Sequence, residues 1–260
     1  MTAATVAALR THWQLAQPMQ DKSQRFVTPT HEPDMPAGHG PMGKALVEHI
    51  KASEFPCVGS KAAVAQGALR TVECAALGTH GNDAFLLDQL CLFAAELAQA
   101  DPEASTVHSF AAVFEGPLET DEARFEAMLW SQLQRLHTLD FRRGSRWSKD
   151  VSTNPDSPDF SLSLAGHAFF VIGLHPGASR MARRFQHPTL VFNSHQQFER
   201  LRADGRYQKM QAATRARDIA LQGSINPNLA DFGTAAETRQ YSGRKVDADW
   251  RCPFHVMGKQ

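Results

Sequence analysis

Two stretches of the chain place apolar residues at helical spacing. Leucine, phenylalanine and alanine recur every three or four positions over residues 86–97, after Asn82 or Asp83, either of which can cap a helix. A second apolar stripe, residues 125–136, follows Thr120-Asp121-Glu122, which places a cap and two acids where a helix begins. The pattern predicts two amphipathic helices.

Other stretches have strand patterns. Residues 160–164 alternate strictly between apolar and polar, residues 165–167 can turn, and residues 168–174 are almost continuously apolar. This order predicts an antiparallel hairpin. Residues 106–114 and 189–193 are rich in β-branched and aromatic side chains, and we expect a strand in each.

Three further helices are predicted, over residues 61–70 with Ser60 as the cap, over 196–202 and over 207–221, before a loop-rich end. We find no β-α-β alternation in this order of elements. The predicted class is therefore α+β, with a mainly antiparallel sheet flanked by helices.

The first 43 residues differ from the rest. Five of the fourteen prolines lie within residues 17–43, so we expect residues 1–43 to form an N-terminal helix and a Pro-rich arm before one domain over 44–260. Residues 38–43 match G-x-G-x-x-G. The preceding residues 31–36 are not an apolar strand, so we interpret the match as chance.

Charge and composition exclude several classes. The 260 residues carry 27 basic and 27 acidic side chains, and a zero net charge gives no global attraction to nucleic acid or to a membrane. The charge is nevertheless uneven, because residues 73–126 hold eleven acids and one arginine, whereas residues 175–217 hold nine basic residues and two acids. The longest apolar stretch, residues 84–100, contains two acids and cannot span a bilayer.

The N-terminus lacks the charge pattern of a secretory signal, so we expect a cytoplasmic protein. The four cysteines in a chain of this length are not a disulfide framework, and none has zinc-site spacing. Each thiol therefore needs its own interpretation.

Cys57 precedes the predicted helix in the segment Phe-Pro-Cys-Val-Gly-Ser. Free backbone N–H groups and the helix dipole stabilise a thiolate at such a position. A glycine two residues later allows a close approach of the backbone, and thiolate-ligated haem proteins present sulfur to iron in this way. The alternative is a buried, inert cysteine.

His175 ends the predicted apolar strand, and we expect a helix after it that carries Arg180, Arg183 and Arg184 on one face. Such a face suits paired carboxylates, for example haem propionates. Alternatively, the arginines form a solvated basic face or pair with the acidic half of the chain. His175 can be a metal ligand, a proton relay or a structural hydrogen-bonding group.

The loop-rich end contains further candidates without helical or strand periodicity. Tyr241 and Arg244 can hold a carboxylate, Asp231 or Glu237 can receive a cationic substrate, and Cys252 is a second candidate thiolate.

A set of linked motifs resembles the YqcI/YcgG family from about residue 44 to residue 254. The motifs are Phe-Pro-Cys-x-Gly at 55–59, Trp130 through Leu133 to His137, Asp159-Phe160-Ser161, residues 169–176, Ala178-Ser179-Arg180, Gln222-Gly223-Ser224, Asn226-Pro227, Tyr241-Ser242-Gly243-Arg244 and Cys252-Pro253-Phe254. Characterised relatives include haem-dependent arginine N-hydroxylases of cycloserine and guanitoxin biosynthesis.

The resemblance implies haem b, dioxygen and hydroxylation of a nitrogen on arginine or a related guanidino or amino compound. It makes Cys57 the preferred axial ligand, with His175 second and Cys252 third, and makes Arg180, Arg183 and Arg184 candidates for the propionates, with Tyr241 and Arg244 behind them. His175, Asp231 and Glu237 are then the candidate catalytic residues. A separate electron-donor reductase is implied, no nucleic acid or membrane partner is expected, and a homodimer is left open.

Two other functions remain open on the sequence. One is a non-catalytic haem-binding or sensor protein with the same ligand. The other needs no metal and uses Cys57 as a nucleophile with a histidine, as in a thiol hydrolase or transferase.

Overall fold

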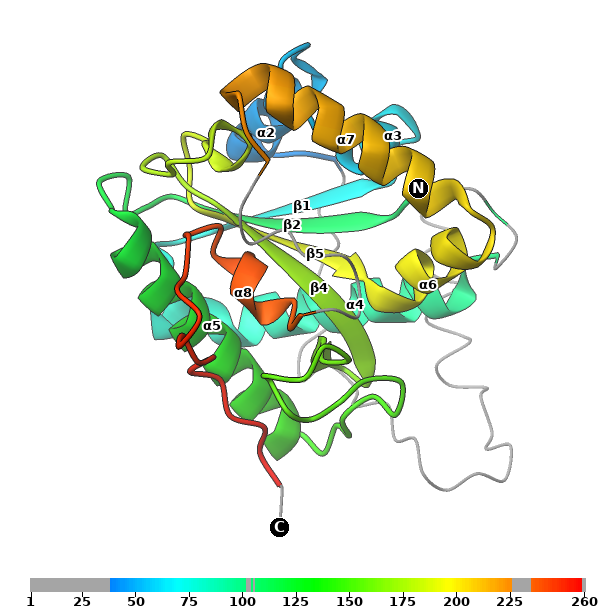
Figure 1. Ribbon diagram of the computed structural model, residues 1–260. Helices are drawn as coiled ribbons and strands as arrows, with labels where there is room; N and C mark the ends of the chain where they lie inside the picture. Colours follow the sequence, from blue (N-terminus) through cyan, green and yellow to red (C-terminus); the bar gives the residue numbers. More distant parts are fainter. Residues whose placement is uncertain (1–37, 102–103, 105, 226–234, 259–260) are drawn as a thin grey trace.

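A five-stranded sheet forms the centre of the computed structural model, which describes residues 38–101, 104, 106–225 and 235–258. The strands are β1 (Leu69–Cys74), β2 (Ser109–Phe114), β3 (Leu162–Leu164), β4 (His167–Leu174) and β5 (Thr189–Ser194). Their order is β1-β2-β5-β4-β3; β1 and β2 are parallel and the other neighbours are antiparallel (Figure 1). The predicted α+β class and mainly antiparallel sheet are confirmed.

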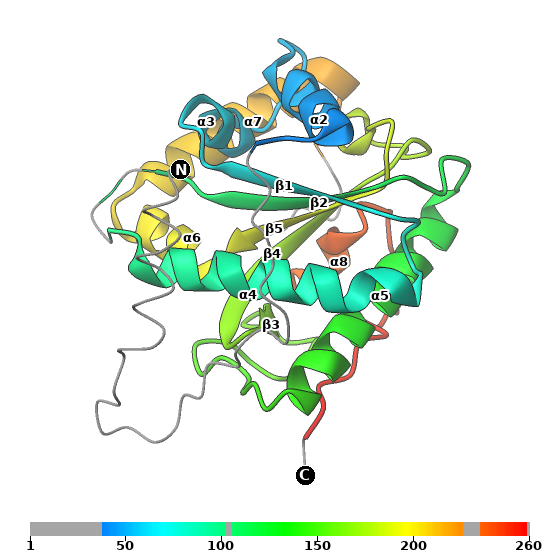
Figure 2. The same cartoon turned by 180° about the vertical axis from the view of Figure 1, so that it is seen from behind.

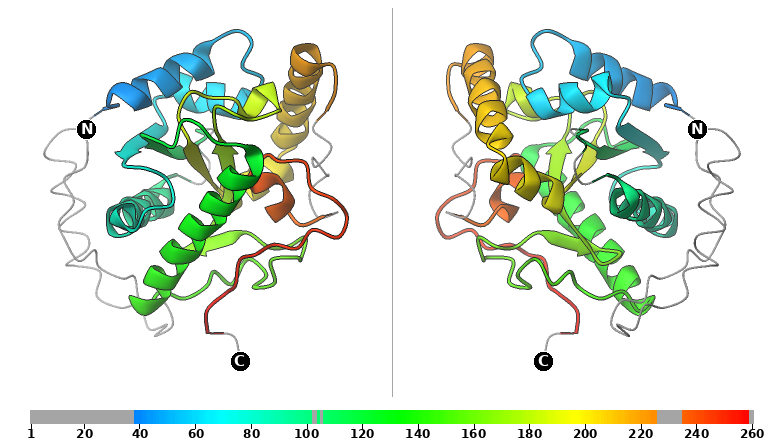
Figure 3. Two further views of the ribbon diagram at one scale, coloured as in Figure 1. Left: turned by 90° about the vertical axis from the view of Figure 1, so that its left-hand side faces the viewer. Right: turned by 90° about the vertical axis from the view of Figure 1, so that its right-hand side faces the viewer.

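Helices cover both faces of the sheet (Figures 2 and 3). They are α2 (Pro41–Lys51), α3 (Val58–Ala65), α4 (Asp83–Gln99), α5 (Glu122–Arg142), α6 (His195–Ala203), α7 (Arg206–Gln222) and α8 (Thr238–Tyr241), with short 3₁₀ turns η1 (His80–Asn82) and η2 (Met181–Arg183). The larger core packs α4 and α5 on one face, and a smaller core packs α2 and α3 on the other.

The fully buried strand β2 shows how the sequence serves both cores. Phe110, Ala112 and Phe114 belong to the larger core, whereas Ala111 and Val113 belong to the smaller one. Successive side chains of a strand point to opposite faces, so an uninterrupted apolar run is required where both faces are covered.

The two amphipathic helices, the hairpin and the strand at 189–194 are confirmed. Asp121 caps α5 by accepting a hydrogen bond from the backbone N–H of Arg124 at 2.7 Å. This helix continues to Arg142, so His137 and Asp140 lie inside it rather than at its end.

The prediction for residues 61–70 is wrong at both ends. The helix α3 begins at Val58, with Cys57 as its N-cap residue, so Ser60 lies inside the first turn. It ends at Ala65, because Gly67 adopts a φ of +64°, and the chain continues into strand β1. The β1–α4–β2 crossover also corrects the expectation of no β-α-β unit, since β1 and β2 are parallel.

The glycine-rich match lies at the start of α2, and residues 1–37 of the predicted arm lie outside the described residues. Pro41 occupies the first helical position. The backbone N–H of Gly43 donates to the carboxylate of Glu73 at 2.9 Å, so a side chain of the protein occupies the place that a phosphate takes in a dinucleotide site. Across the described ranges, no helix is long and apolar enough to cross a bilayer.

Candidate functional site

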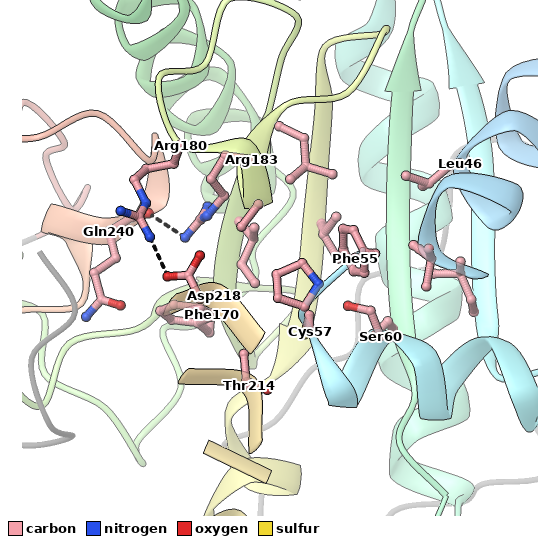
Figure 4. A pocket seen from close by; sticks show the side chains of 18 of the residues that line it. Leu46, Phe55, Cys57, Ser60, Phe170, Arg180, Arg183, Thr214, Asp218 and Gln240 are labelled. Carbon is pink, nitrogen blue, oxygen red and sulfur yellow. Dashed lines mark hydrogen bonds and ion pairs between the residues drawn. The ribbon is translucent and has the colours of Figure 1, made fainter. Parts of the chain in front are cut away.

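A cavity of about 200 Å³ lies between the sheet, α3 and α7 (Figure 4). Most of its wall is apolar, and comes from α2, the segment before α3 and strands β4 and β5. The polar part comes mainly from η2 and its N-cap residue, α7 and α8. The lining residues are Leu46, Ile50, Phe55, Pro56, Cys57, Ser60, Leu69, Ser109, Phe170, Ile172, Leu174, Arg180, Ala182, Arg183, Val191, Thr214, Arg215, Asp218 and Gln240.

Cys57 is half-buried and lines this cavity at the N-terminus of α3, where the sequence predicted a thiol before a helix. The backbone N–H of Val58 donates to the hydroxyl of Thr214 on α7 at 3.2 Å. A Cβ atom on Gly59 would lie 3.2 Å from the terminal methyl of Met210, so this glycine permits the close approach of α7. From the sequence we had expected this glycine to allow the close approach of a haem instead.

The segment after β4 is not the predicted α-helix. It contains the 3₁₀ turn η2, with Arg180 as its N-cap residue and Arg184 as its C-cap residue. The backbone N–H of His175 donates to the carbonyl of Arg183 at 3.0 Å, so the chain folds back on the strand end and no helical face forms. The i, i+3, i+4 spacing therefore does not bring the three arginines together.

Arg183 is half-buried on the cavity wall. Its guanidinium donates to the carbonyls of Gly173 at 3.1 Å and Gln240 at 3.2 Å. Burial lowers its pKa to about 10, and the nearby Cys57 and Asp218 oppose that shift. No carboxylate among the described residues lies within ion-pair distance of it, so the cavity wall carries a half-buried cation whose hydrogen bonds go to carbonyl groups.

Arg180 also lines the cavity but has a counterion. It donates to Asp218 of α7 at 2.5 Å and to the carbonyl and hydroxyl of Ser224 at 2.8 and 3.1 Å. The second carboxylate oxygen of Asp218, Oδ1, is buried without a hydrogen-bond partner. Arg184 instead donates to the carbonyl of Ala178 and lines a separate hollow beside α2.

Sequence reasoning missed Asp218. The available signal was a single acid in a helix that otherwise carries Arg206, Lys209, Arg215 and Arg217. It is also the one fully buried residue of α7. A lone buried acid on a basic helix indicates an ion pair with another element.

His175 lies at the end of β4, as predicted, but does not line this cavity. Its ring stacks on Phe125 of α5 with centroids 4.2 Å apart, and burial lowers its pKa. Its Nδ1 atom has no hydrogen-bond partner among the described residues.

Glu237 and Tyr241 form a buried network on the other side of β4. The Tyr241 hydroxyl donates to the Glu237 carboxyl at 2.7 Å, and the Ser161 hydroxyl donates to the same oxygen at 2.6 Å. Ser161 also lies 3.0 Å from Nδ1 of His195. Burial raises the pKa of Glu237 to about 8, although both hydrogen bonds oppose that shift.

Two other predicted site residues lie away from Cys57, and a third is not among the described residues. Arg244 pairs with Glu126 of α5, with 2.7 Å between Nε and Oε2. Cys252 packs against the larger core, and burial raises its pKa to about 12, which disfavours a thiolate. Asp231 lies outside the described residues.

The polar groups that line the cavity are one thiol, three guanidinium groups, the carboxylate of Asp218, three hydroxyls and one amide. No histidine is among the described residues that line it. Within the described part of the chain, no three His, Cys, Asp or Glu side chains converge on a common metal position. A haem iron needs a single protein ligand on one side, so this donor set is compatible with haem.

The fold and cavity define an α+β protein that presents a thiol at a helix N-terminus and a buried arginine to one internal space. The chain belongs to the YqcI/YcgG family, whose model matches residues 46–255. No curated protein and no solved structure matches it.

Proposed function

We propose that this protein binds haem b in the cavity beside Cys57 and hydroxylates a nitrogen of a guanidino or amino compound, with arginine as the reference substrate. The observation that carries the proposal is the presence of a thiol at the N-cap of α3 and of the half-buried Arg183 on the wall of one mainly apolar cavity. Membership of the YqcI/YcgG family supports it.

Cys57 is the proposed ligand of the iron. It is the N-cap residue of α3, is half-buried and lines the cavity, so its sulfur can reach a group bound there. His175 and Cys252, the other ligands considered, face Phe125 and the larger core respectively.

Arg183 is the proposed partner of a propionate. A half-buried guanidinium without a close carboxylate favours an anionic ligand, because the ligand's charge offsets the cost of its partial desolvation. Arg180 lies on the same wall, where Asp218 and Ser224 fix its orientation.

The enclosed space is smaller than a porphyrin requires. Small-molecule sites usually measure about 300–1,000 Å³, whereas this cavity measures about 200 Å³. Helix α7 forms its outer wall and is tied to the body by Thr214, Asp218 and Gln222. Haem binding therefore requires an outward movement of α7.

Bound haem supplies the activation of dioxygen. One oxygen atom enters an N–H bond of the substrate, and the other leaves as water after two electrons and two protons are added. The electrons come from a separate reductase. Phe170 and Ile172 keep bulk water from the reacting face, which suppresses side reactions.

The thiol hydrolase or transferase alternative requires a base close to Cys57. The described lining of the cavity contains no histidine to serve as that base. The non-catalytic haem-binding alternative uses the same ligand. It is distinguished from the oxygenase by whether arginine changes the haem spectrum and is turned over.

The test is expression with a haem precursor, followed by the absorption spectrum of the reduced carbon monoxide complex. We expect a thiolate-type spectrum in the wild type and its loss in Cys57→Ser, with Cys252→Ser as the matched control that retains it. Retention of both the spectrum and arginine turnover in Cys57→Ser contradicts the ligand assignment. A haem spectrum that arginine leaves unchanged, without turnover, favours the sensor function.

Metal-free protoporphyrin tests Arg183 independently of the iron. We expect Arg183→Gln to weaken its binding, measured by fluorescence titration, and to have little effect on the dimethyl ester, which lacks the carboxylates. Equal losses for the acid and the ester show that the variant only disturbs the fold.

A further inference from the structure

Three easily oxidised rings are in contact next to the cavity. Tyr241 stacks on Trp130 with centroids 5.5 Å apart and an interplanar angle of 17°. Trp130 contacts Trp250 at 6.3 Å. Such separations are typical of rings in van der Waals contact. Tyrosine and tryptophan are among the side chains that lose an electron most readily.

The inner end of this array lies one ring from the cavity. Phe170 lines the cavity, and its ring meets Tyr241 edge to face at 5.6 Å. Figure 4 shows the Phe170 side chain next to Asp218 on the cavity wall. The outer end is Trp250, which is half-buried and therefore reaches solvent.

The array has a place for the proton of the phenol. Loss of an electron makes a phenol strongly acidic, so fast oxidation of a buried tyrosine requires an acceptor already in hydrogen-bond contact. The Tyr241 hydroxyl donates to the Glu237 carboxyl at 2.7 Å, and this carboxyl can take the phenol proton where it is ionised, that is as the pH reaches its raised pKa of about 8. Ser161 then links that carboxyl to His195 at the start of α6.

These contacts involve three of the few tryptophan and tyrosine residues of the chain. The chain has four tryptophans and two tyrosines, and Trp13 lies outside the described residues. Of the five that the structure describes, three form one continuous series of ring contacts, in which Tyr241 stacks on Trp130 and Trp130 meets Trp250 at a tilt of 41°.

We propose that Tyr241, Trp130 and Trp250 form a one-electron relay that moves oxidising equivalents from the haem cavity to a surface site at Trp250, where small reductants of the phenol or ascorbate class are oxidised. This inference rests on the proposed haem function. Its role is to supply the electrons that reduce the oxidised site to its resting state when peroxide reacts there in the absence of substrate.

The reaction balances with named reactants. One hydrogen peroxide accepts two electrons and two protons and gives two waters, and the electrons come in two passes from Tyr241. In each pass Trp130 donates an electron to the oxidised Tyr241, and Trp250 donates an electron to the oxidised Trp130. Trp250 then takes a hydrogen atom from an external reductant. The guanidinium of Arg239, 5.6 Å from the Trp250 ring, favours the neutral, deprotonated indolyl radical over its cation.

The first test uses the haem-free protein, so that it is independent of haem binding. Azidyl radicals generated by pulse radiolysis oxidise tryptophan, and transfer to tyrosine is followed through the separate absorption bands of the two radicals. This transfer runs opposite to the proposed relay, but the electronic coupling between Trp130 and Tyr241 is the same in both directions, so the test reports on the same contact. We expect first-order tyrosyl formation that is independent of protein concentration and slows by an order of magnitude or more in Trp130→Phe.

Two further variants keep the test decisive if Trp130→Phe does not fold. Tyr241→Phe retains the ring stack and should abolish tyrosyl formation, whereas Tyr207→Phe is the matched control and should leave it unchanged. The relay is overturned if Trp130→Phe forms the tyrosyl radical at the wild-type rate. It is also overturned if the tyrosyl signal depends on Tyr207 rather than on Tyr241.

The second test uses haem-loaded protein with peroxide and guaiacol and no substrate. We expect Trp250→Phe to lose most of the phenol oxidation while the haem spectrum is unchanged. Unchanged phenol oxidation in this variant overturns the surface site and leaves the haem assignment intact.

Discussion

The buried carboxyl of Glu237 should make the protein less stable as pH rises above neutrality. In the folded chain burial raises its pKa to about 8, compared with 4.5 for the free group. The folded state therefore keeps a proton that the unfolded state has already lost. The stabilisation is complete below about pH 4.5 and disappears as the pH rises through 8.

The size of the effect follows from the pH window. Each pH unit in which only the folded state holds the proton changes the unfolding free energy by about 1.4 kcal/mol. From pH 6.5 to 8 the loss is about 1.5 kcal/mol, because the dependence flattens as the folded pKa is reached. Buried histidines act in the opposite direction and below this window, since burial lowers the pKa of His137 and His167 to about 4.

Glu237→Gln is the matched perturbation. The glutamine oxygen can accept from Ser161 and Tyr241 as the acid does, and its amide replaces the protonated oxygen without titrating. Urea unfolding of the haem-free protein at pH 6.5, 7.25 and 8 should give a falling unfolding free energy for the wild type and a flat one for the variant. Equal slopes for the two proteins refute the reasoning.

Two other predictions concern packing and the cavity wall. Gly173→Ala should lower the unfolding free energy by about 1–3 kcal/mol, because its new Cβ would lie 2.6 Å from the ring of Phe125. Gly59→Ala is the control; its Cβ meets only the flexible end of Met210, so a loss as large as that of Gly173→Ala in thermal unfolding would contradict the steric argument. Haem loading should increase cleavage by trypsin within α7, at Lys209, Arg215 or Arg217, because the helix has to move outward. Unchanged or slower cleavage at these sites argues against that movement.

Periodicity predicted the elements whose two faces differ. The stripe of α5 is visible because one face meets the core and the other faces solvent. The alternation of β3 is visible although both of its faces are buried, because Ser161 and Ser163 face hydrogen-bond partners on one side while the apolar residues face the core. Strand β1 was missed because residues 69–74 follow a short helix without a proline or a strong polar break, and only pairing with β2 selects the extended form. Local sequence does not contain that partner.

In the candidate site, too, features set by neighbouring residues were predicted and features set by distant residues were not. The position of Cys57 before a helix depends on neighbouring residues and was predicted. The separation of Arg184 from Arg180 and Arg183 depends on the chain folding back on His175, which helical spacing does not encode. Asp218 pairs with Arg180 across 38 positions, so no local pattern linked them.

The walls of the cavity come from segments far apart in the chain, from Leu46 on α2 to Gln240 on α8. A gene product truncated before α7 retains the thiol and Arg183 yet leaves that space open to water on one side. Split versions of this protein should therefore regain ligand affinity only when both pieces are expressed together, which would make the cavity a reporter of reassembly.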